Sequence, residues 1–170
     1  MQAIETIELT SAESSITFDN IPQTYTDLCI VLSLRNSSSS DGITLSFAGS
    51  TSNFSSRKLE GDGSSASSGS RSDNLFPVTQ VPSSYTSNTF SNVTIYIPNY
   101  AEAQAHSFSI DSVTENNATT SFQNIYAGLC TNTTAIDEIV IGSLANNFVE
   151  YSSATLYGIL AGSDGTTTVS

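Results

Sequence analysis

Short apolar runs, separated by clusters of turn-forming residues, are the feature of this sequence that most restricts its fold. Several of these runs alternate with a period of two. Val93, Ile95 and Ile97 alternate with Thr94 and Tyr96, so the two sets fall on opposite faces of an extended segment. A strand with one buried and one solvated face needs this pattern, whereas a helix needs a longer period. The sequence therefore predicts an all-β protein.

Ten such runs follow one another along the chain, and we expect each to form a strand. They are Ile4–Leu9, Ser15–Phe18, Asp27–Leu34, Ile43–Phe47, Leu75–Val81, Phe90–Ile97, Ser107–Val113, Phe122–Cys130, Ile136–Ile141 and Ala154–Leu160. The run Leu28–Leu32 is apolar on both faces, which is typical of a central strand. Gly158 lies inside the last run and predicts either a bulge or a close approach of the backbone.

No linker, fixed repeat or change of composition divides the chain, so residues 1–170 are expected to form one domain. Serine and threonine supply about a third of the residues and disfavour helix interiors. The lack of crossover helices argues against a parallel α/β sheet. The predicted fold is a two-sheet antiparallel β-sandwich of the jelly-roll type. The Ser- and Gly-rich stretch Glu60–Asn74 is expected to be a flexible loop.

The charge of the chain restricts its partners. Sixteen acidic residues outnumber four basic residues, which gives a formal net charge of −12. A surface of this charge repels phosphate, so we expect neither a nucleic-acid partner nor a membrane partner. The acidic residues are scattered singly, which favours solubility and repulsion between copies over an acidic binding site.

Residues for catalysis or metal binding are sparse. His106 is the only histidine, has no G-x-S-x-G elbow to accompany it, and is expected to lie on the surface at the start of a strand. Zinc-ligand spacing is absent. Glu60 and Asp62 sit on a Gly-rich loop but lack the remainder of a calcium-loop pattern, so a solvated acidic loop is expected. We therefore expect no enzymatic activity, no cofactor and no metal.

The two cysteines both lie in apolar runs. Cys29 is part of the expected central strand, and Cys130 ends a later run. A disulfide would require their Cα atoms to lie within about 7 Å of each other. We expect both thiols to be free, with Cys29 buried and unreactive and Cys130 in the core.

Four stretches stand out in order along the chain: SSITFDNIPQTYTDLCIVLSLR from Ser14, NVTIYIPNY from Asn92, HSFSIDSVTENNATTSFQNIYAGLCTNTTAI from His106, and SSATLYGI from Ser152. Together they resemble a family of small virion structural proteins of tailed phages, abundant in marine and cyanobacterial phages. There are departures. Ala48-Gly49-Ser50 stands where members often have an Asn-Gly-Asp type turn, and Cys130 stands where relatives tend to have an aromatic residue.

The resemblance implies a β-sandwich part of a virion, assembled in the host cytoplasm and without a known active residue. The first hypothesis is a capsid decoration or cement protein that binds the major capsid protein in many copies. The alternative is a tail or fibre module that recognises a glycan on the host surface. The resemblance leaves head and tail both open.

Self-association is a further expectation. Leu75, Phe76 and Val78 follow a polar segment and lack strong periodicity, so this stretch, with Arg71 before it, is the candidate interface with another copy or a virion partner. The alternative is that Phe76 closes one end of the sandwich.

Overall fold

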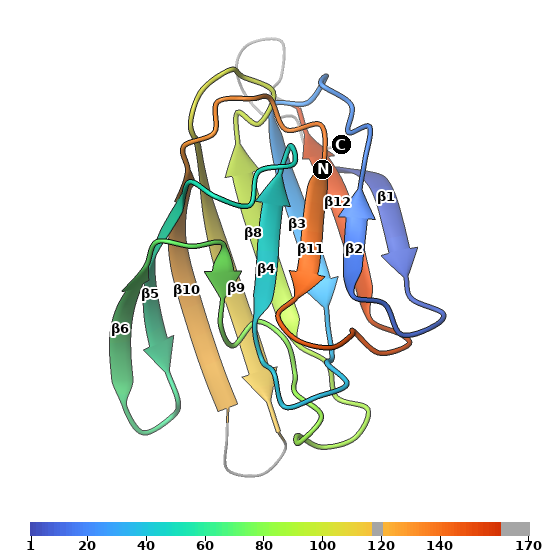
Figure 1. The fold of residues 1–170 in the computed structure, drawn as a ribbon, viewed down its shortest axis with the longest axis vertical. Helices are drawn as coiled ribbons and strands as arrows, with labels where there is room; N and C mark the ends of the chain where they lie inside the picture. Colours follow the sequence, from blue (N-terminus) through green and yellow to red (C-terminus); the bar gives the residue numbers. More distant parts are fainter. Residues whose placement is uncertain (117–120, 161–170) are drawn as a thin grey trace.

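The structure is a computed structural model that describes residues 1–116 and 121–160, and it contains two antiparallel sheets packed face to face (Figure 1). The larger sheet has the order β1 (Gln2–Glu8), β12 (Ser153–Ile159), β3 (Asp27–Ser33), β8 (Asn92–Pro98), β9 (His106–Glu115), β10 (Ser121–Cys130), β5 (Phe54–Gly61), β6 (Ala66–Arg71). The smaller sheet has the order β2 (Ser15–Phe18), β11 (Ile139–Ser143), β4 (Ile43–Phe47), β7 (Leu75–Phe76). The described residues contain no helix. The predicted fold is confirmed.

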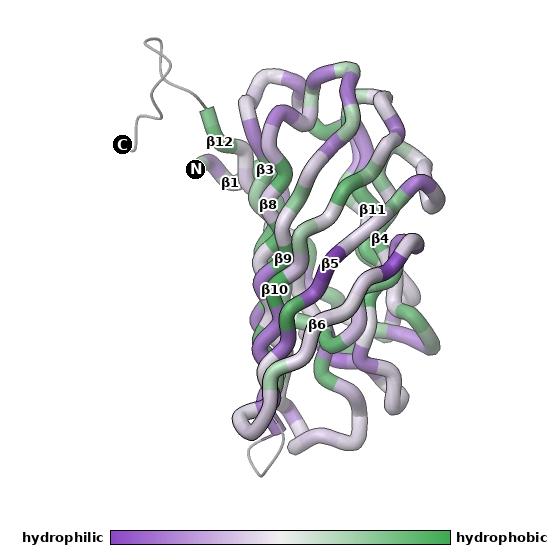
Figure 2. Tube along the Cα trace, turned by 90° about the vertical axis from the view of Figure 1, so that its left-hand side faces the viewer, coloured by the Kyte–Doolittle hydropathy of each residue, from purple (hydrophilic) through white to green (hydrophobic). Residues whose placement is uncertain are grey.

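The chain changes sheet repeatedly before it forms a meander. The strands β1, β3 and β5 belong to the larger sheet, whereas β2 and β4 between them belong to the smaller one. The strands β8, β9 and β10 then follow one another as neighbours in the larger sheet. The core lies between the two sheets, which Figure 2 shows edge-on.

The alternating residues face the core as expected. Val93, Ile95 and Ile97 of β8 are all buried, while Tyr96 on the opposite face of the strand is exposed. In β9 the burial pattern alternates without a break from His106 to Glu115. The strand β3 has two sheet neighbours, β12 and β8, so its expected interior position is confirmed.

An aromatic cluster fills the core near β9. The ring of Phe108 lies with its centroid 5.4 Å from that of Phe47, 6.0 Å from Phe54 and 5.6 Å from Phe76. Gly128 on β10 accommodates this ring, because a Cβ at that position would lie 2.2 Å from the Cζ atom of Phe108. The cluster joins both sheets, since β4 and β7 contribute rings to it as well as β5 and β9.

The expectation of a flexible loop over Glu60–Asn74 is wrong. The chain there forms most of a hairpin, in which β5 pairs with β6 from Ser56 opposite Arg71 to Gly61 opposite Ala66. The Oδ1 atom of Asp62 accepts the backbone N–H groups of two serines in the turn, at 2.8 and 2.7 Å. Ladder hydrogen bonds come from the backbone, so a Ser- and Gly-rich segment can pair when the adjacent strand offers a free edge.

The expected strand Leu75–Val81 is also shorter than predicted. Only Leu75 and Phe76 pair with β4, and the chain then leaves the small sheet. Pro77 lacks the N–H group that a ladder needs, and Val78 has φ of 57°, which is outside the β region. The segment 77–81 instead crosses the inner face of β9 and β10.

Candidate functional site

Residues of two sequence motifs meet at one end of the large sheet. The Oδ2 atom of Asp27 accepts the Tyr96 hydroxyl at 2.6 Å, and its Oδ1 atom accepts the Asn99 backbone N–H at 3.0 Å. The Tyr100 hydroxyl donates to the Pro22 carbonyl. The hydrogen bond to Asp27 raises the pKa of Tyr96 to about 12. These residues hold the chain before β3 against the chain after β8, which is a structural role.

The last of the four sequence motifs, SSATLYGI from Ser152, lies at the same end of the molecule. Gly158 on β12 lies beneath the half-buried ring of Tyr25, and the Thr26 backbone N–H donates to the carbonyl of Ile159 at 2.8 Å. The register of β12 with β3 continues without a shift through Gly158. The expected close approach is therefore confirmed, with a side chain as the approaching group.

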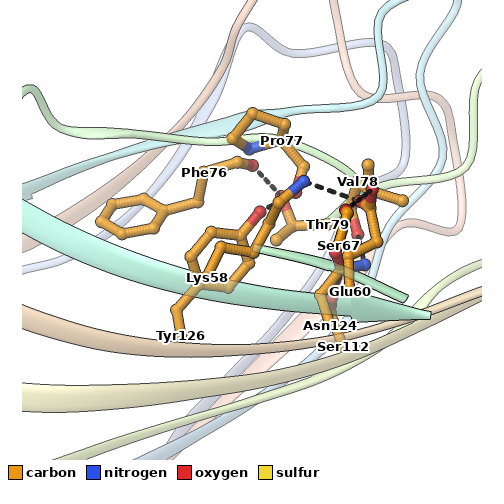
Figure 3. A network of polar contacts seen from close by, with 10 residues as sticks. All are labelled: Lys58, Glu60, Ser67, Phe76, Pro77, Val78, Thr79, Ser112, Asn124 and Tyr126. Carbon is orange, nitrogen blue, oxygen red and sulfur yellow. Dashed lines mark hydrogen bonds and ion pairs between the residues drawn. The ribbon is translucent and has the colours of Figure 1, made fainter. Parts of the chain in front are cut away.

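A polar network occupies the inner face of the large sheet where the small sheet ends (Figure 3). The carbonyl of Val78 accepts the Ser112 hydroxyl at 3.0 Å and the Asn124 amide at 3.4 Å, and the Tyr126 hydroxyl donates to the Pro77 carbonyl. Burial is the main reason that the pKa of Tyr126 is raised. These bonds attach segment 77–81 to β9 and β10, so the network supports the fold.

The sequence-predicted interface residues are divided between core and surface. Phe76 is fully buried against Phe108 and Tyr126, and Val78 is buried as well. Leu75 is half-buried, and Arg71 is paired with an aspartate on its own chain at 2.5 Å. Phe76 and Val78 are therefore not on the surface of the chain, and self-association through this stretch stays a prediction.

His106 and the cysteines occupy structural positions. His106 is 1% exposed, contrary to the expected surface position, and its Nε2 atom lies 2.9 Å from the carbonyl oxygen of Thr134. Cys29 and Cys130 are both free and buried, on strands that have β8 and β9 between them. Within the described residues, no group of three or more His, Cys, Asp and Glu side chains is placed to hold a metal ion.

The outer face of the large sheet carries an unusual set of exposed apolar side chains. Leu59 is 63% exposed, Ile125 51%, Val113 39% and Leu129 36%; we call these four residues the outer apolar face. They belong to β5, β10 and β9, and Leu59 lies directly opposite Ile125 in the ladder. Contiguous exposed apolar side chains on a soluble protein mark a surface that contacts another molecule.

Two charged residues flank this face. Arg57 lies two residues before Leu59 on the same side of β5, and Asp111 lies opposite Ile125 on β9. Neither residue takes part in an ion pair within residues 1–116 and 121–160. An open groove of about 530 Å³ runs beside Leu59 and Ile125, with Arg57 among its lining residues. The face thus combines an apolar centre, a cation, an anion and a hollow.

A second hollow, of about 650 Å³, lies between the loop that precedes β8 and the segment Val149–Tyr151 that precedes β12. Tyr151 is 63% exposed and Asn88 faces the same hollow, and both have positive φ, of 68° and 62°. A bulky residue in this conformation is strained unless its surroundings hold it there. Here the backbone N–H of Tyr151 donates to the Leu9 carbonyl at 2.8 Å.

No family model and no curated protein matches the chain. A solved structure similar to it is the crystal structure of the galectin LEC-6 of Caenorhabditis elegans, with 12% sequence identity, 88% of this chain and 95% of that chain covered, and a TM-score of 0.36. No helix among the described residues has the length and apolar character required to cross a membrane.

Proposed function

We propose that this chain is a non-enzymatic structural protein of a tailed-phage particle and that it decorates the capsid in many copies. The observation that carries the proposal is the outer apolar face, because Leu59 and Ile125 expose large side chains beside an open groove. Exposed apolar side chains of this kind mark interaction surfaces, and an assembly component needs such a surface.

The resemblance to phage virion proteins is the reason for proposing that the assembly is a phage particle. Its motif residues have a physical reason to occur together, since Asp27 binds Tyr96 and Asn99, and Tyr25 covers Gly158. The net charge of −12 fits the role too. Charge of one sign limits non-specific aggregation of free copies before the capsid lattice gathers them.

The test is the composition of purified particles of a phage that encodes this chain. Quantitative mass spectrometry is expected to find the chain in hundreds of copies per particle, and a deletion mutant is expected to produce particles that lose their DNA more readily on heating. A handful of copies per particle would indicate that the protein is located on the tail and not on the head. Absence from the particle would refute the virion role.

A second candidate is a tail or fibre module that binds a host glycan. The observation that favours it is Tyr151, an exposed aromatic ring held at positive φ beside a hollow that Asn88 and Glu150 also line. An aromatic face next to amide and carboxylate groups suits a sugar ring, which stacks and forms hydrogen bonds. Glycan-array binding that is lost in Tyr151→Ala but kept in Tyr157→Ala would support this role.

A further inference from the structure

We propose that the outer apolar face binds the same face of a second copy of this chain, so that the protein forms a symmetric dimer in which Arg57 of each copy pairs with Asp111 of the other. This inference rests on the proposed function as an assembly component, and it names the partner of the face.

The ladder register fixes the arrangement of the face. Arg57 pairs with Ala127 and Leu59 pairs with Ile125 between β5 and β10, and Ile125 pairs with Asp111 between β10 and β9. Arg57 and Asp111 are therefore separated by two strand spacings, roughly 10 Å, across the sheet. Along the strands they are separated by two residues, or roughly 7 Å. Ile125 lies near the line between them, and Leu59 lies to one side of it.

A two-fold axis through this point makes the face complementary to itself. We place this axis in the plane between the two copies, where it crosses β10 between Ile125 and Ala127. The axis is perpendicular to the line from Arg57 to Asp111, so the rotation places Arg57 of each copy over Asp111 of the other. The same operation brings Leu59 and Ile125 close to the axis. The two apolar pairs then meet at the centre, and both ion pairs lie at the rim.

The charges distinguish a second copy from a general acidic or apolar partner. Arg57 and Asp111 each lack an ion-pair partner among the described residues, so the centre of the face carries one charge of each sign on a chain of net charge −12. A partner of uniform charge satisfies only one of the two groups. A second copy satisfies both, because the symmetric contact forms each pair twice.

The groove can accommodate apolar side chains of the second copy. It has a volume of about 530 Å³ and is bordered by Leu59, Ile125, Ala127 and the small side chains of Ser68 and Ser70 on β6. Small residues on the edge strand leave the groove open, so Leu59 of the second copy can insert beside Ile125. Central apolar anchors in pockets supply most of the energy of such interfaces.

The experiment is a charge-reversal cycle on the full chain, measured by sedimentation equilibrium. The wild type is expected to show a monomer–dimer equilibrium at micromolar concentration. Arg57→Asp and Asp111→Arg are each expected to weaken the dimer at least ~10-fold, because each places like charges together twice. The double variant is expected to recover to within about threefold of the wild type. Glu102→Arg, an exposed acid outside the face, makes the same change in net charge as Asp111→Arg and serves as the control.

The outcomes separate this inference from the proposed function. A wild type that stays monomeric at 100-fold higher concentration, or a double variant as weak as the single variants, overturns the dimer. Both variants change exposed residues, and their unfolding midpoints show whether the fold is retained. A dimer that is absent from phage particles refutes the virion role alone, whereas a monomer that is found in particles refutes the dimer alone.

Discussion

The ring of Tyr25 lies directly over Gly158, and a Cβ on that glycine would lie 2.3 Å from the Cγ atom and 2.4 Å from the Cδ1 atom of the tyrosine. These two residues are more than a hundred positions apart in the sequence and belong to different motifs. The contact requires a glycine for space alone, because Gly158 is not among the residues with positive φ. The absence of a side chain at Gly158 thus leaves the space on β12 that the ring of Tyr25 occupies.

The first prediction follows from this contact. Gly158→Ala must displace Tyr25 or the strand, and overpacking of this kind costs about 1–3 kcal/mol of unfolding free energy. Urea denaturation of the full chain measures the loss. Gly69→Ala is the matched control, since Gly69 also lies in a strand of the large sheet, but a Cβ added there would have no other atom within 4 Å. That variant is expected to be neutral or slightly more stable. Equal losses in the two variants would contradict the role of the Tyr25 contact.

The sequence predicts the sandwich because its alternation is strong in the meander. In β8 and β9 the buried and exposed sets separate cleanly, so both strands could be placed from their side chains. The hairpin of β5 and β6 could not be found in this way. Its residues from Ala66 to Ser70 are all small or polar, and the strand is held by backbone pairing with β5.

The outer apolar face could not be predicted because it depends on register. In β10 both faces carry apolar residues, with Tyr126 inward and Ile125 outward, so alternation alone does not say which face is buried. Leu59 immediately precedes the stretch that composition assigns to a loop. Only the pairing of β5 with β10 and of β10 with β9 brings Leu59, Ile125 and Asp111 into one row.

The second prediction concerns the thiols. Burial raises the pKa values of Cys29 and Cys130, and the thiolate is the reactive form, so both react slowly at neutral pH. A thiol reagent is expected to label neither residue in the native chain and both after unfolding. Reductant is expected to leave the melting temperature unchanged, because two strands lie between the cysteines. A large fall in melting temperature with reductant would show that a disulfide exists.

The third prediction concerns alkaline pH. The pKa of Tyr96 is raised from 10.0 to about 12 by its hydrogen bond to Asp27 and by burial. A raised pKa means that this phenol stabilises the fold fully below pH 10 and loses that contribution as the pH rises towards 12. Tyr96→Phe is therefore expected to lose less stability than the wild type over this interval. The difference in phenolate absorbance between the two proteins should titrate near pH 12. A midpoint near pH 10 would mean that the Asp27 bond does not persist in solution.

The last prediction concerns Arg35, a buried cation that is bound by carbonyl oxygens. Its guanidinium donates to the carbonyls of Thr86 at 2.8 Å, Thr89 at 3.0 Å, Tyr85 at 3.1 Å and Ser83 at 3.3 Å. The side chain thus organises the loop before β8, and the loop in turn lines the hollow around Tyr151. A lysine has one donor centre and cannot reach carbonyls in such different directions.

Arg35→Lys is expected to lower the unfolding free energy by about 2–3 kcal/mol, since hydrogen bonds to a charged donor are worth ~1.5–3 kcal/mol and the lysine cannot keep all of them. Hydrogen exchange is expected to accelerate in residues 83–91 more than in β9 and β10. Arg71→Lys is the control, because Arg71 is more than a third exposed and its pairing with Asp73 lies at the surface. That variant should change stability by less than about 1 kcal/mol. If Arg35→Lys behaves like the control and the loop stays protected, the loop is held by its own backbone contacts, and Arg35 does not organise it.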